Sequence, residues 1–397
     1  MICLNSRVKK LLRDEIESVL RTFLLIFCLI AVFSFHKYFC TKKTKFASSD
    51  HNNNDVNSYI NYTYLLTEEE LNFPLAFSVI TYRDFDRAFR LIKAIYRPNN
   101  VYCIHTDKNT NSIEYTEFVQ YVQQLGENIY FVPEDQRVHV VWGRYSVLEA
   151  DLNCAKLLLA KSKKWRYFIN LTGHEFPLRT NWELVKALKA LNGLNVAPAH
   201  CLQSKPWRIP PKRRVPLDIV WYEGPVHVAL RREFVEYMLY NEKALILLES
   251  LKKHEKVMRQ CTIPDEQYFT ILNNNPQTFQ IPGVFQGSFK QEENYFVLTR
   301  VKLWWFHISK CHTNIYRNAI CMLGSGDLPL LKKHPHFFAN KFLPDVEPEA
   351  YDELERWLAD KVLYEHNNNR THPSFLYQYY VNYTWAQTHN LTFNGEF

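Results

Sequence analysis

Apolar and polar positions alternate along the first half of the chain in blocks that predict strands and helices in turn. Between Ala76 and Asn109 an apolar run, AFSVIT, is followed by a polar break and then by apolar residues three and four positions apart, from Phe85 to Ile95. A second apolar run, VYCIH, ends at Thr106. The i, i+3, i+4, i+7 spacing is typical of an amphipathic helix, and short apolar runs bounded by turn residues are typical of buried strands. The stretch therefore predicts a strand, a helix and a second strand.

The same alternation continues further along the chain. We expect a helix over residues 111–125, a strand at NIYFV, a helix over Val147–Ala160 and a strand at RYFINLT. Strands interleaved with helices predict an α/β fold with a mostly parallel central sheet and right-handed crossovers. Ligands bind at the carboxyl edge of such a sheet, so a nucleotide-type pocket is expected there. After residue 195 the pattern loosens, and a Pro-rich basic loop, KPWRIPPKRR, precedes an expected helix over Arg231–Leu251.

An apolar segment near the N-terminus, TFLLIFCLIAVFSFHKYF, predicts an uncleaved signal anchor at residues 22–40. Its purely apolar part is about 14 residues, and a full span needs about 20, so flanking aromatic residues and Lys37 must complete it. A cleaved signal peptide is the alternative, but no small-x-small cleavage site follows. The expected organisation is a cytoplasmic tail (1–21), the anchor (22–40), a polar stem (41–72), a globular domain (73–362) and a C-terminal extension (363–397).

The net charge of +7 is concentrated around this segment. Residues 1–45 hold nine Lys and Arg against three Asp and Glu, whereas the rest of the chain holds 39 against 38. Basic residues that flank an apolar segment indicate association with a lipid bilayer, and a nearly neutral body argues against nucleic-acid binding.

Cysteines and glycosylation sequons favour a body in the secretory lumen. Six cysteines follow the apolar segment, and an even number suits an oxidising compartment. The N-x-S/T pattern occurs at Asn61, Asn170, Asn369, Asn382 and Asn390. Asn170 lies in the strand-like run FINLT, where we expect it to be buried. Glycosylation is expected at the other four, in a type II membrane protein.

Two acidic positions at the predicted sheet edge invite a ligand role. Asp84-Phe85-Asp86 is formally a D-x-D motif, which can hold a divalent metal through hard oxygen ligands. It also begins the predicted helix, where Asp is a common N-cap, and we favour the cap. Asp107 ends the second strand, where a carboxylate can accept from a ribose or base or can start a turn. For Asp107 we favour the ligand role.

Further candidate chemistry lies in the second half of the chain. Pro264-Asp265-Glu266 starts an amphipathic run, and a carboxylate in a first helical turn is kept ionised by the helix dipole, which suits a general base. A capping Asp-Glu pair is the structural alternative. Lys341 and Arg317 could contact phosphate or could be solvated surface charges. Walker-type, HExxH, CxxC and G-x-S-x-G motifs are absent from the sequence, which argues against the common kinases, metalloproteases, zinc modules and serine hydrolases.

In their order and spacing these segments resemble the core-2/I-branching β-1,6-N-acetylglucosaminyltransferase family. The resemblance runs from about Pro74 to Asp345 and is carried by AFSVITY, RLIKAIYRPNNVYCIHTDK, VVWGRYSVLEADLNCAKLL, WRYFINLTGHEFPLRTN, REFVEYML, PDEQYFTIL and GDLPLLKKHPHFFANKF. It implies a GT-A-like fold, a type II protein of the Golgi membrane, and an inverting enzyme that needs no metal or other cofactor. The implied partners are a UDP-sugar donor and an O-glycan on a glycoprotein, with a homodimer possible.

The resemblance also implies roles for individual residues. Glu266 matches the catalytic base, and Lys341 matches a cation on the diphosphate. Arg317 is the expected partner of Lys341, although it stands four residues before Cys321 where the family has three. The nucleotide side is matched by Ile80, Thr81, Tyr82, Asp107 and Trp142. The implied disulfides are Cys103–Cys154 and Cys311–Cys321, which leaves Cys201 and Cys261 as a third candidate pair.

Some positions depart from the family pattern. Thr172 replaces a family cysteine, and Pro198 stands nearest to where the family has an acidic sugar contact. The family's basic sugar-binding loop is matched loosely by Lys205, Arg208 and Arg213. Aromatic residues 304–306 could form an acceptor platform or pack in the core. The donor is therefore expected to be UDP-GlcNAc, with UDP-glucose, a xylosyltransferase-type reaction on peptide Ser, and an inactive lectin-like protein as alternatives.

Overall fold

The computed structural model describes residues 66–388, apart from residues 111, 203–204, 286–296 and 307–310. The predicted anchor at 22–40 and the sequons at Asn61 and Asn390 lie outside this part. Within the described residues no helix is both long enough and apolar enough to cross a membrane.

A five-stranded sheet forms the centre of the fold. Its order is β3-β2-β1-β4-β8, in which the first four strands are parallel and β8 is antiparallel to β4. The strands are β1 (Leu75–Thr81), β2 (Val101–Thr106), β3 (Ile129–Phe131), β4 (Tyr167–Thr172) and β8 (Ala229–Arg231). This confirms the four predicted strands and the mostly parallel α/β sheet. The register sets Thr81 beside Thr106 and Ile80 beside Thr172, so three strands end together at the carboxyl edge.

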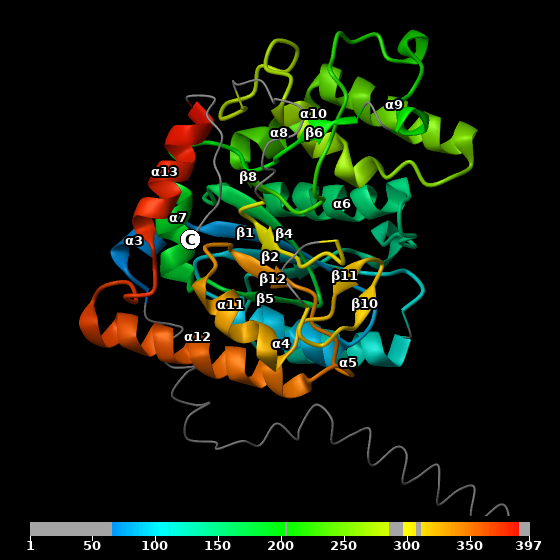
Figure 1. Cartoon of the computed structure of the whole chain (residues 1–397). Helices are drawn as coiled ribbons and strands as arrows, with labels where there is room; N and C mark the ends of the chain where they lie inside the picture. Colours follow the sequence, from blue (N-terminus) through cyan, green and yellow to red (C-terminus); the bar gives the residue numbers. More distant parts are fainter. Residues whose placement is uncertain (1–65, 111, 203–204, 286–296, 307–310, 389–397) are drawn as a thin grey trace, which may run out of the picture. The chain divides into compact units, whose positions relative to one another are not determined.

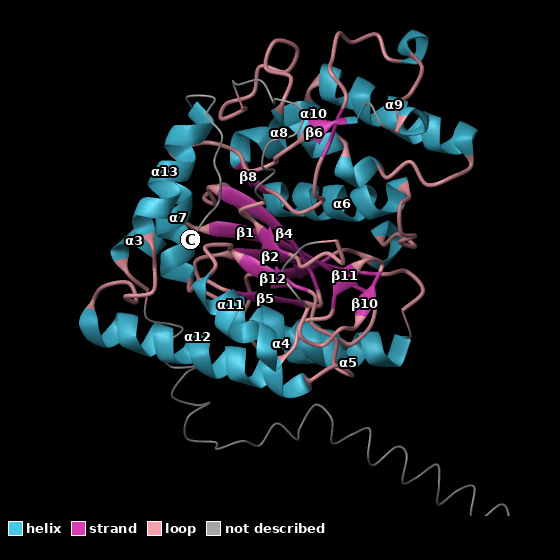
Figure 2. Ribbon diagram, in the orientation of Figure 1, coloured by secondary structure: helices cyan, strands magenta, loops and turns pink. Residues whose placement is uncertain are grey.

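Helices cover both faces of this sheet (Figures 1 and 2). On one face lie α4 (Phe85–Ile95) and α5 (Ser112–Gln123), and on the other lies α6 (Tyr145–Lys161). Beyond α6 lie α8 (Arg232–Tyr240), α9 (Glu242–Met258) and α10 (Tyr268–Asn273). The prediction of one helix over Arg231–Leu251 was wrong, because Asn241 adopts an extended backbone and its side chain caps α9 by accepting from the Lys243 amide.

Short strands that the pattern did not reveal complete the fold. A second sheet has the order β5-β12-β9, and two hairpins are formed by β10 with β11 and by β6 with β7. Their bounds are β5 (Glu175–Pro177), β12 (Phe338–Asn340), β9 (Arg300–Val301), β10 (Tyr316–Arg317), β11 (Ile320–Cys321), β6 (His200–Cys201) and β7 (Tyr222–Glu223). Strands of two or three residues are too short for an alternating pattern to be visible in the sequence.

The expected domain ends do not coincide with structural boundaries. The limit at residue 362 falls inside α12 (Pro348–Asn368), and α13 (Tyr377–Thr388) packs against α7 (Asn181–Ala190), as Figure 1 shows. Tyr380 of α13 is fully buried, and its hydroxyl accepts from Arg179 Nε at 2.8 Å. At the other end, α3 (Glu68–Leu71) lies before residue 73 and also packs on α7, where Asn181 Nδ2 donates to Glu70 Oε1 at 2.7 Å.

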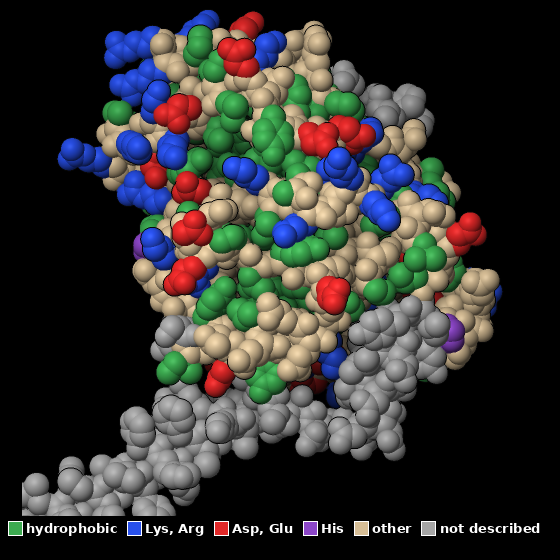
Figure 3. Space-filling model, turned by 180° about the vertical axis from the view of Figure 1, so that it is seen from behind, with side chains coloured by type: hydrophobic (Ala, Val, Ile, Leu, Met, Phe, Trp, Pro, Cys, Tyr) green, Lys and Arg blue, Asp and Glu red, His purple; other side chains and the backbone are tan. Residues whose placement is uncertain are grey.

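The apolar core is divided by the sheets. One cluster fills the space between the central sheet and helices α6, α8, α9 and α10, and another lies between the second sheet and α12 with α11 (Leu328–Lys333). On the face seen in Figure 3, acidic and basic side chains are interspersed, as expected from the nearly neutral body.

Both implied disulfides are present. Cys103–Cys154 ties β2 to α6 inside the first core, and Cys311–Cys321 closes the loop that contains the β10–β11 hairpin. Cys261 is a free thiol, so the suggested pair of Cys201 with Cys261 was wrong.

Replacing both Cys103 and Cys154 by Ala should lower the free energy of unfolding by about 4 kcal/mol, because the bond closes a long loop in the unfolded chain. Replacing Cys311 and Cys321, whose sequence separation is 10 rather than 51, should cost less, about 3 kcal/mol. Denaturant unfolding of the secreted lumenal part measures both, with Cys261→Ala as the free-thiol control. Equal losses for the two pairs would contradict the loop-length argument.

Candidate active site

The carboxyl edge of the central sheet gathers the residues predicted for the nucleotide. β1 ends at Thr81, whose backbone carbonyl accepts from the Asp107 amide at 3.1 Å. Thr81 is buried, and its hydroxyl donates to the Arg83 carbonyl at 3.2 Å. Tyr82, in contrast, is 55% exposed. The first two strand ends therefore meet as predicted, and Tyr82 is the side chain among them that is open to a ligand.

Asp107 anchors the loop that carries Trp142. One carboxylate oxygen accepts from the Asn109 amide at 2.7 Å, and the other accepts from the Val140 amide at 2.6 Å. Burial raises the pKa of Asp107, but these two amide donors and His139 outweigh it and hold the pKa below the ordinary value. The turn role that we had set against a ligand role is thus present. Trp142, two residues after Val140, is 67% exposed near this edge.

The D-x-D motif does not cap the helix as predicted. Asp84 occupies the N-cap position of α4, but its backbone is left-handed, at φ 53°, and its side chain makes no cap hydrogen bond. Instead, Asp84 Oδ2 lies 2.7 Å from His174 Nε2 and 3.3 Å from Arg83 Nε. The contact with His174 is the main reason that the pKa of Asp84 is lowered. The carboxylate was drawn away from the helix by a partner from the β4–β5 turn, which local sequence does not reveal.

Lys341 lies beside the same histidine. It follows β12, and the amide of the next residue, Phe342, donates to the His174 carbonyl at 2.8 Å. Burial lowers the pKa of the Lys341 ammonium, Glu175 opposes this, and the nearby Arg83 adds to it. The structure thus joins Lys341 to the edge that carries Tyr82 and Asp84.

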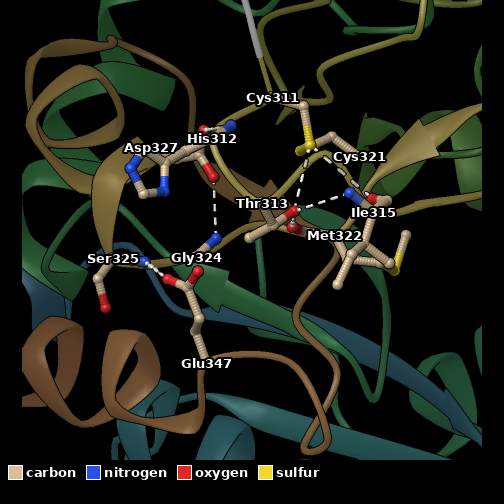
Figure 4. Close-up of a disulfide and its surroundings, with 10 residues drawn as sticks. All are labelled: Cys311, His312, Thr313, Ile315, Cys321, Met322, Gly324, Ser325, Asp327 and Glu347. Carbon is tan, nitrogen blue, oxygen red and sulfur yellow. Dashed lines mark hydrogen bonds between the residues drawn. A yellow bond between two sulfur atoms is a disulfide. The ribbon is translucent and has the colours of Figure 1, made fainter.

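Arg317 is not brought to Lys341 in the same way. It lies on the β10–β11 hairpin, where its side chain is exposed and makes no hydrogen bond or ion pair with another described residue. Figure 4 shows what holds the hairpin. Next to the disulfide, the Thr313 hydroxyl donates to the Met322 carbonyl at 2.6 Å, and Asp327 accepts from the amides of His312 and Gly324 at 3.0 and 2.9 Å. The scaffold is firm, and the Arg317 side chain on it is unconstrained by these contacts.

Glu266 lies in a 3₁₀ turn, η5 (Pro264–Glu266), that precedes α10. It was predicted in the first turn of an α-helix whose dipole would favour its charge, and this was wrong: burial raises the pKa of the partly exposed Glu266 carboxyl. The turn is joined to the Trp142 loop, because the Ile263 amide donates to the Gly143 carbonyl at 3.1 Å. One loop therefore connects the Asp107 edge to the Glu266 turn.

Charged side chains surround Glu266. Arg208, from η3 (Pro206–Arg208), places Nη1 at 3.3 Å from Glu266 Oε2. The same nitrogen lies 2.6 Å from Glu223 Oε2, and Lys205 also pairs with Glu223. Arg213 is exposed on the following turn, η4 (Lys212–Arg214). Of the three basic positions in the Pro-rich loop, Arg208 is the one that contacts Glu266.

A buried ionic network lies below these groups. Arg300 Nε donates to Glu175 Oε2 at 2.5 Å, and His227 Nε2 lies 2.8 Å from Glu175 Oε1. Lys302 follows β9 and is half-buried within electrostatic reach of Glu175, Glu266 and Lys341. Burial lowers the pKa of Lys302 to about 8. The arrangement brings a carboxylate with raised pKa close to half-buried cations, which suits proton removal on one side and stabilisation of developing negative charge on the other.

Sequence reasoning did not assign roles to several of these residues. His174, Glu175 and Arg300 lie in the quoted or neighbouring segments, but their partners are far away in the chain, and Glu223 stands in no motif. Polar residues within otherwise apolar runs, such as Arg300 in YFVLTRVKLWWF, were the available signal. Among the described residues no cluster of three His, Cys, Asp or Glu side chains could hold a metal ion.

The aromatic residues after β9 are on the surface. Trp305 and Phe306 are 64% and 61% exposed, and the rings of Trp304 and Phe306 stack at 5.9 Å. The alternative that these residues pack in the core is therefore wrong for Trp305 and Phe306. Asn170, in contrast, is buried as predicted, with Nδ2 donating to Asp151 Oδ2 at 2.8 Å.

Comparison with known proteins gives the class. The family model described as Core-2/I-Branching enzyme matches residues 75–332, and the chain belongs to this family. It is 33% identical to the human N-acetyllactosaminide beta-1,6-N-acetylglucosaminyl-transferase over 329 residues, 76% of each chain. It is 30% identical to beta-1,3-galactosyl-O-glycosyl-glycoprotein beta-1,6-N-acetylglucosaminyltransferase 3 of Rattus norvegicus over 330 residues, 75% of this chain and 71% of the relative. The resemblance drawn from the sequence is thereby confirmed.

A pH-dependent loss of stability should originate beside Glu266, at Asp265. Burial, reinforced by the Glu266 charge, raises the pKa of Asp265 to about 8 from an ordinary 3.8. Because the folded-state pKa is the higher one, the neutral carboxyl stabilises the fold fully below pH 3.8, and this contribution is lost as pH rises toward 8. Asp265→Asn should therefore remove part of the slope, on the order of 1 kcal/mol per pH unit between these limits.

The measurement is the free energy of unfolding of wild type and Asp265→Asn at several pH values from 5 to 8. The exposed Asp360→Asn on α12 is the control and should follow the wild-type curve. Parallel curves for wild type and Asp265→Asn would contradict the assignment.

Proposed function

We propose that the chain is an inverting glycosyltransferase that adds a β-1,6-linked GlcNAc from UDP-GlcNAc to O-glycans such as core-1 Gal-GalNAc on glycoproteins. The observation that carries this proposal is the partly exposed Glu266 carboxylate, whose pKa is raised by burial and which lies close to cationic side chains. The names of the relatives, which are β-1,6-N-acetylglucosaminyltransferases, support the reaction and the donor. UDP-glucose is the alternative donor because Pro198 replaces the family's acidic sugar contact.

On the donor side, we assign Ile80, Thr81, Tyr82 and Asp107 to the uridine, with Trp142 as an aromatic contact. The support is that these residues follow two adjacent strand ends or a loop tied to Asp107. Lys341, and Arg317 from its hairpin, would hold the diphosphate without a metal or other cofactor. The low polarity around Lys341, seen in its lowered pKa, would strengthen its attraction for phosphate oxygens.

The reaction is an in-line displacement in this proposal. Glu266 accepts the proton of the acceptor 6-hydroxyl while that oxygen forms a bond to the anomeric carbon. The bond between the anomeric carbon and the UDP oxygen breaks, and UDP leaves with its bonding electron pair. Lys341 and Arg317 stabilise the negative charge that develops on the diphosphate. The exposed Trp305 and Phe306 offer a surface for the acceptor sugar.

The setting that we propose is the Golgi membrane, with residues 22–40 as a type II signal anchor and the catalytic domain in the lumen. Two disulfides among the described residues suit that oxidising compartment. Asn61, Asn369, Asn382 and Asn390 are the proposed glycosylation sites, and the side chains of Asn369 and Asn382 are exposed. A homodimer is part of the proposal without structural support.

A panel assay tests the function directly. The secreted lumenal part is incubated with UDP-GlcNAc, UDP-glucose, UDP-galactose or UDP-xylose and with core-1, N-acetyllactosamine and Ser-peptide acceptors, and the product linkage is identified. We expect a β-1,6-GlcNAc product on an O-glycan, with a rate unchanged by EDTA. Rescue of an EDTA-inactivated enzyme by Mn²⁺ would refute metal independence, and a panel without any product would favour the lectin-like alternative.

Glu266→Gln should reduce kcat by 10²–10⁴-fold, on the order typical for loss of a general base, while UDP binding stays close to wild type. Glu236→Gln, on the exposed side of α8, is the matched control and should keep the wild-type rate. Single-turnover rates and UDP calorimetry measure the two effects. If Glu266→Gln retains more than about a tenth of the rate, Glu266 is not the base.

A further inference from the structure

A buried carboxylate that the proposed mechanism does not use lies next to Glu266. Glu223 ends β7, opposite His200 of β6, and is only 2% exposed. Its Oε1 lies 2.7 Å from His200 Nε2 and also accepts from Lys205 Nζ, and its Oε2 accepts from Arg208 Nη1 at 2.6 Å. Three basic side chains thus converge on one enclosed anion.

Arg208 is shared unequally between two carboxylates. Its Nη1 lies 2.6 Å from Glu223 and 3.3 Å from Glu266, so the shorter and stronger contact is with Glu223. A guanidinium prefers to grip a carboxylate with two parallel hydrogen bonds, and here it reaches Glu266 with one nitrogen at a long distance. The backbone holds the two acids in register, because the Gly224 amide donates to the Glu266 carbonyl at 2.7 Å.

We propose that Glu223 is a positioning residue, which holds Arg208 back from a full ion pair with Glu266 and so leaves the Glu266 carboxylate available to the acceptor hydroxyl. This inference rests on the proposed role of Glu266 as the base. Without Glu223, Arg208 would be free to close on Glu266 with both terminal nitrogens. The base would then be occupied by its neighbour and weakened as a proton acceptor.

The charges around Glu266 give the sign of the effect. The groups that face it are Arg208, Lys205, Lys302, Glu223 and its neighbour Asp265. Burial raises the pKa of Glu266, and the charge of Glu223 raises it further, whereas Arg208, Lys302 and Lys205 lower it. Removing Glu223 takes away a like charge and also releases Arg208, and both changes lower the pKa of Glu266.

Glu223 itself does not titrate in the range where the enzyme can be assayed. Burial alone would raise its pKa, but His200, Lys205 and Arg208 outweigh burial and hold the pKa at about 2. Its charge is therefore constant above about pH 4. The acid limb of a pH profile then reports the titration of the base and not that of Glu223.

The test compares pH profiles of kcat/KM for the secreted lumenal part with UDP-GlcNAc and the acceptor sugar found in the panel assay. In Glu223→Gln the acid limb should move to lower pH, by on the order of one unit, and the plateau should fall several-fold because the base is weaker. In Arg208→Met the limb should move to higher pH. Glu249→Gln, an exposed matched change on α9, should leave the profile in place.

A double variant separates positioning from simple charge removal. With Arg208 replaced by Met, the further change Glu223→Gln should move the limb less than it does in wild type, because there is no guanidinium left to release. UDP calorimetry and thermal unfolding check that each variant is folded. If Glu223→Gln does not fold, Glu223→Asp, which shortens the side chain by one methylene, should move the limb in the same direction by a smaller amount.

An unchanged limb in a folded Glu223 variant, or a limb moved to higher pH, would overturn the proposal. A lower plateau with an unmoved limb would show a merely structural role and would overturn it as well. The proposed base is tested separately by Glu266→Gln. Loss of transfer in Glu266→Gln with an unmoved limb in Glu223→Gln would leave the base in place and remove only the role of Glu223.

Discussion

The buried ion pair of Glu175 with Arg300 is the interaction on which the candidate active site depends. It joins β5 to β9, and Arg300 also donates to the Asn170 carbonyl of β4, so the pair links the small sheet to the central one. Asn340 of β12 donates to Glu175 as well, at 3.2 Å. Two charges so deeply buried are tolerated because each is paired and hydrogen-bonded, and loss of either would leave the other uncompensated. The strands that precede Lys302 and Lys341 are held by this one pair.

The same pair affects the chemistry above it. Lys302 and Lys341 lie within electrostatic reach of the Glu175 carboxylate, which favours their charged forms against burial. Glu266 lies among Arg208, Lys302 and Lys205, and burial together with Glu223 opposes their effect on its pKa. The site is thus a balance of near-equal opposing charges in a region of low polarity. In such a region a change of one charge alters the ionisation of several neighbours.

The elements that the sequence predicted well share a physical property, which is local periodicity. The strand at Leu75–Thr81, the helix at Phe85–Ile95 and the strand at Val101–Thr106 each bury one continuous face, so their patterns of apolar residues are visible without tertiary information. The two-residue and three-residue strands carry no such pattern. The helix over Arg231–Leu251 failed for a different reason: Asn241 is compatible with a helix interior, and the structure uses it as a cap.

For the site, the sequence identified Glu266, Lys341 and the strand-end residues through family resemblance, and the disulfides in the same way. It could not assign Asp84, since a D-x-D motif at a helix start fits a cap, a metal ligand or an ion pair equally well. The choice was made by His174, 90 positions away, which lies 2.7 Å from the Asp84 carboxylate. Glu223 was invisible for the same reason. The sequence by itself determined the fold class, the family and the identity of the candidate base, because these follow from local patterns and ordered motifs. Only the tertiary structure decided how that base is charged and held, because a pKa depends on burial and on charges that folding brings together from distant parts of the chain.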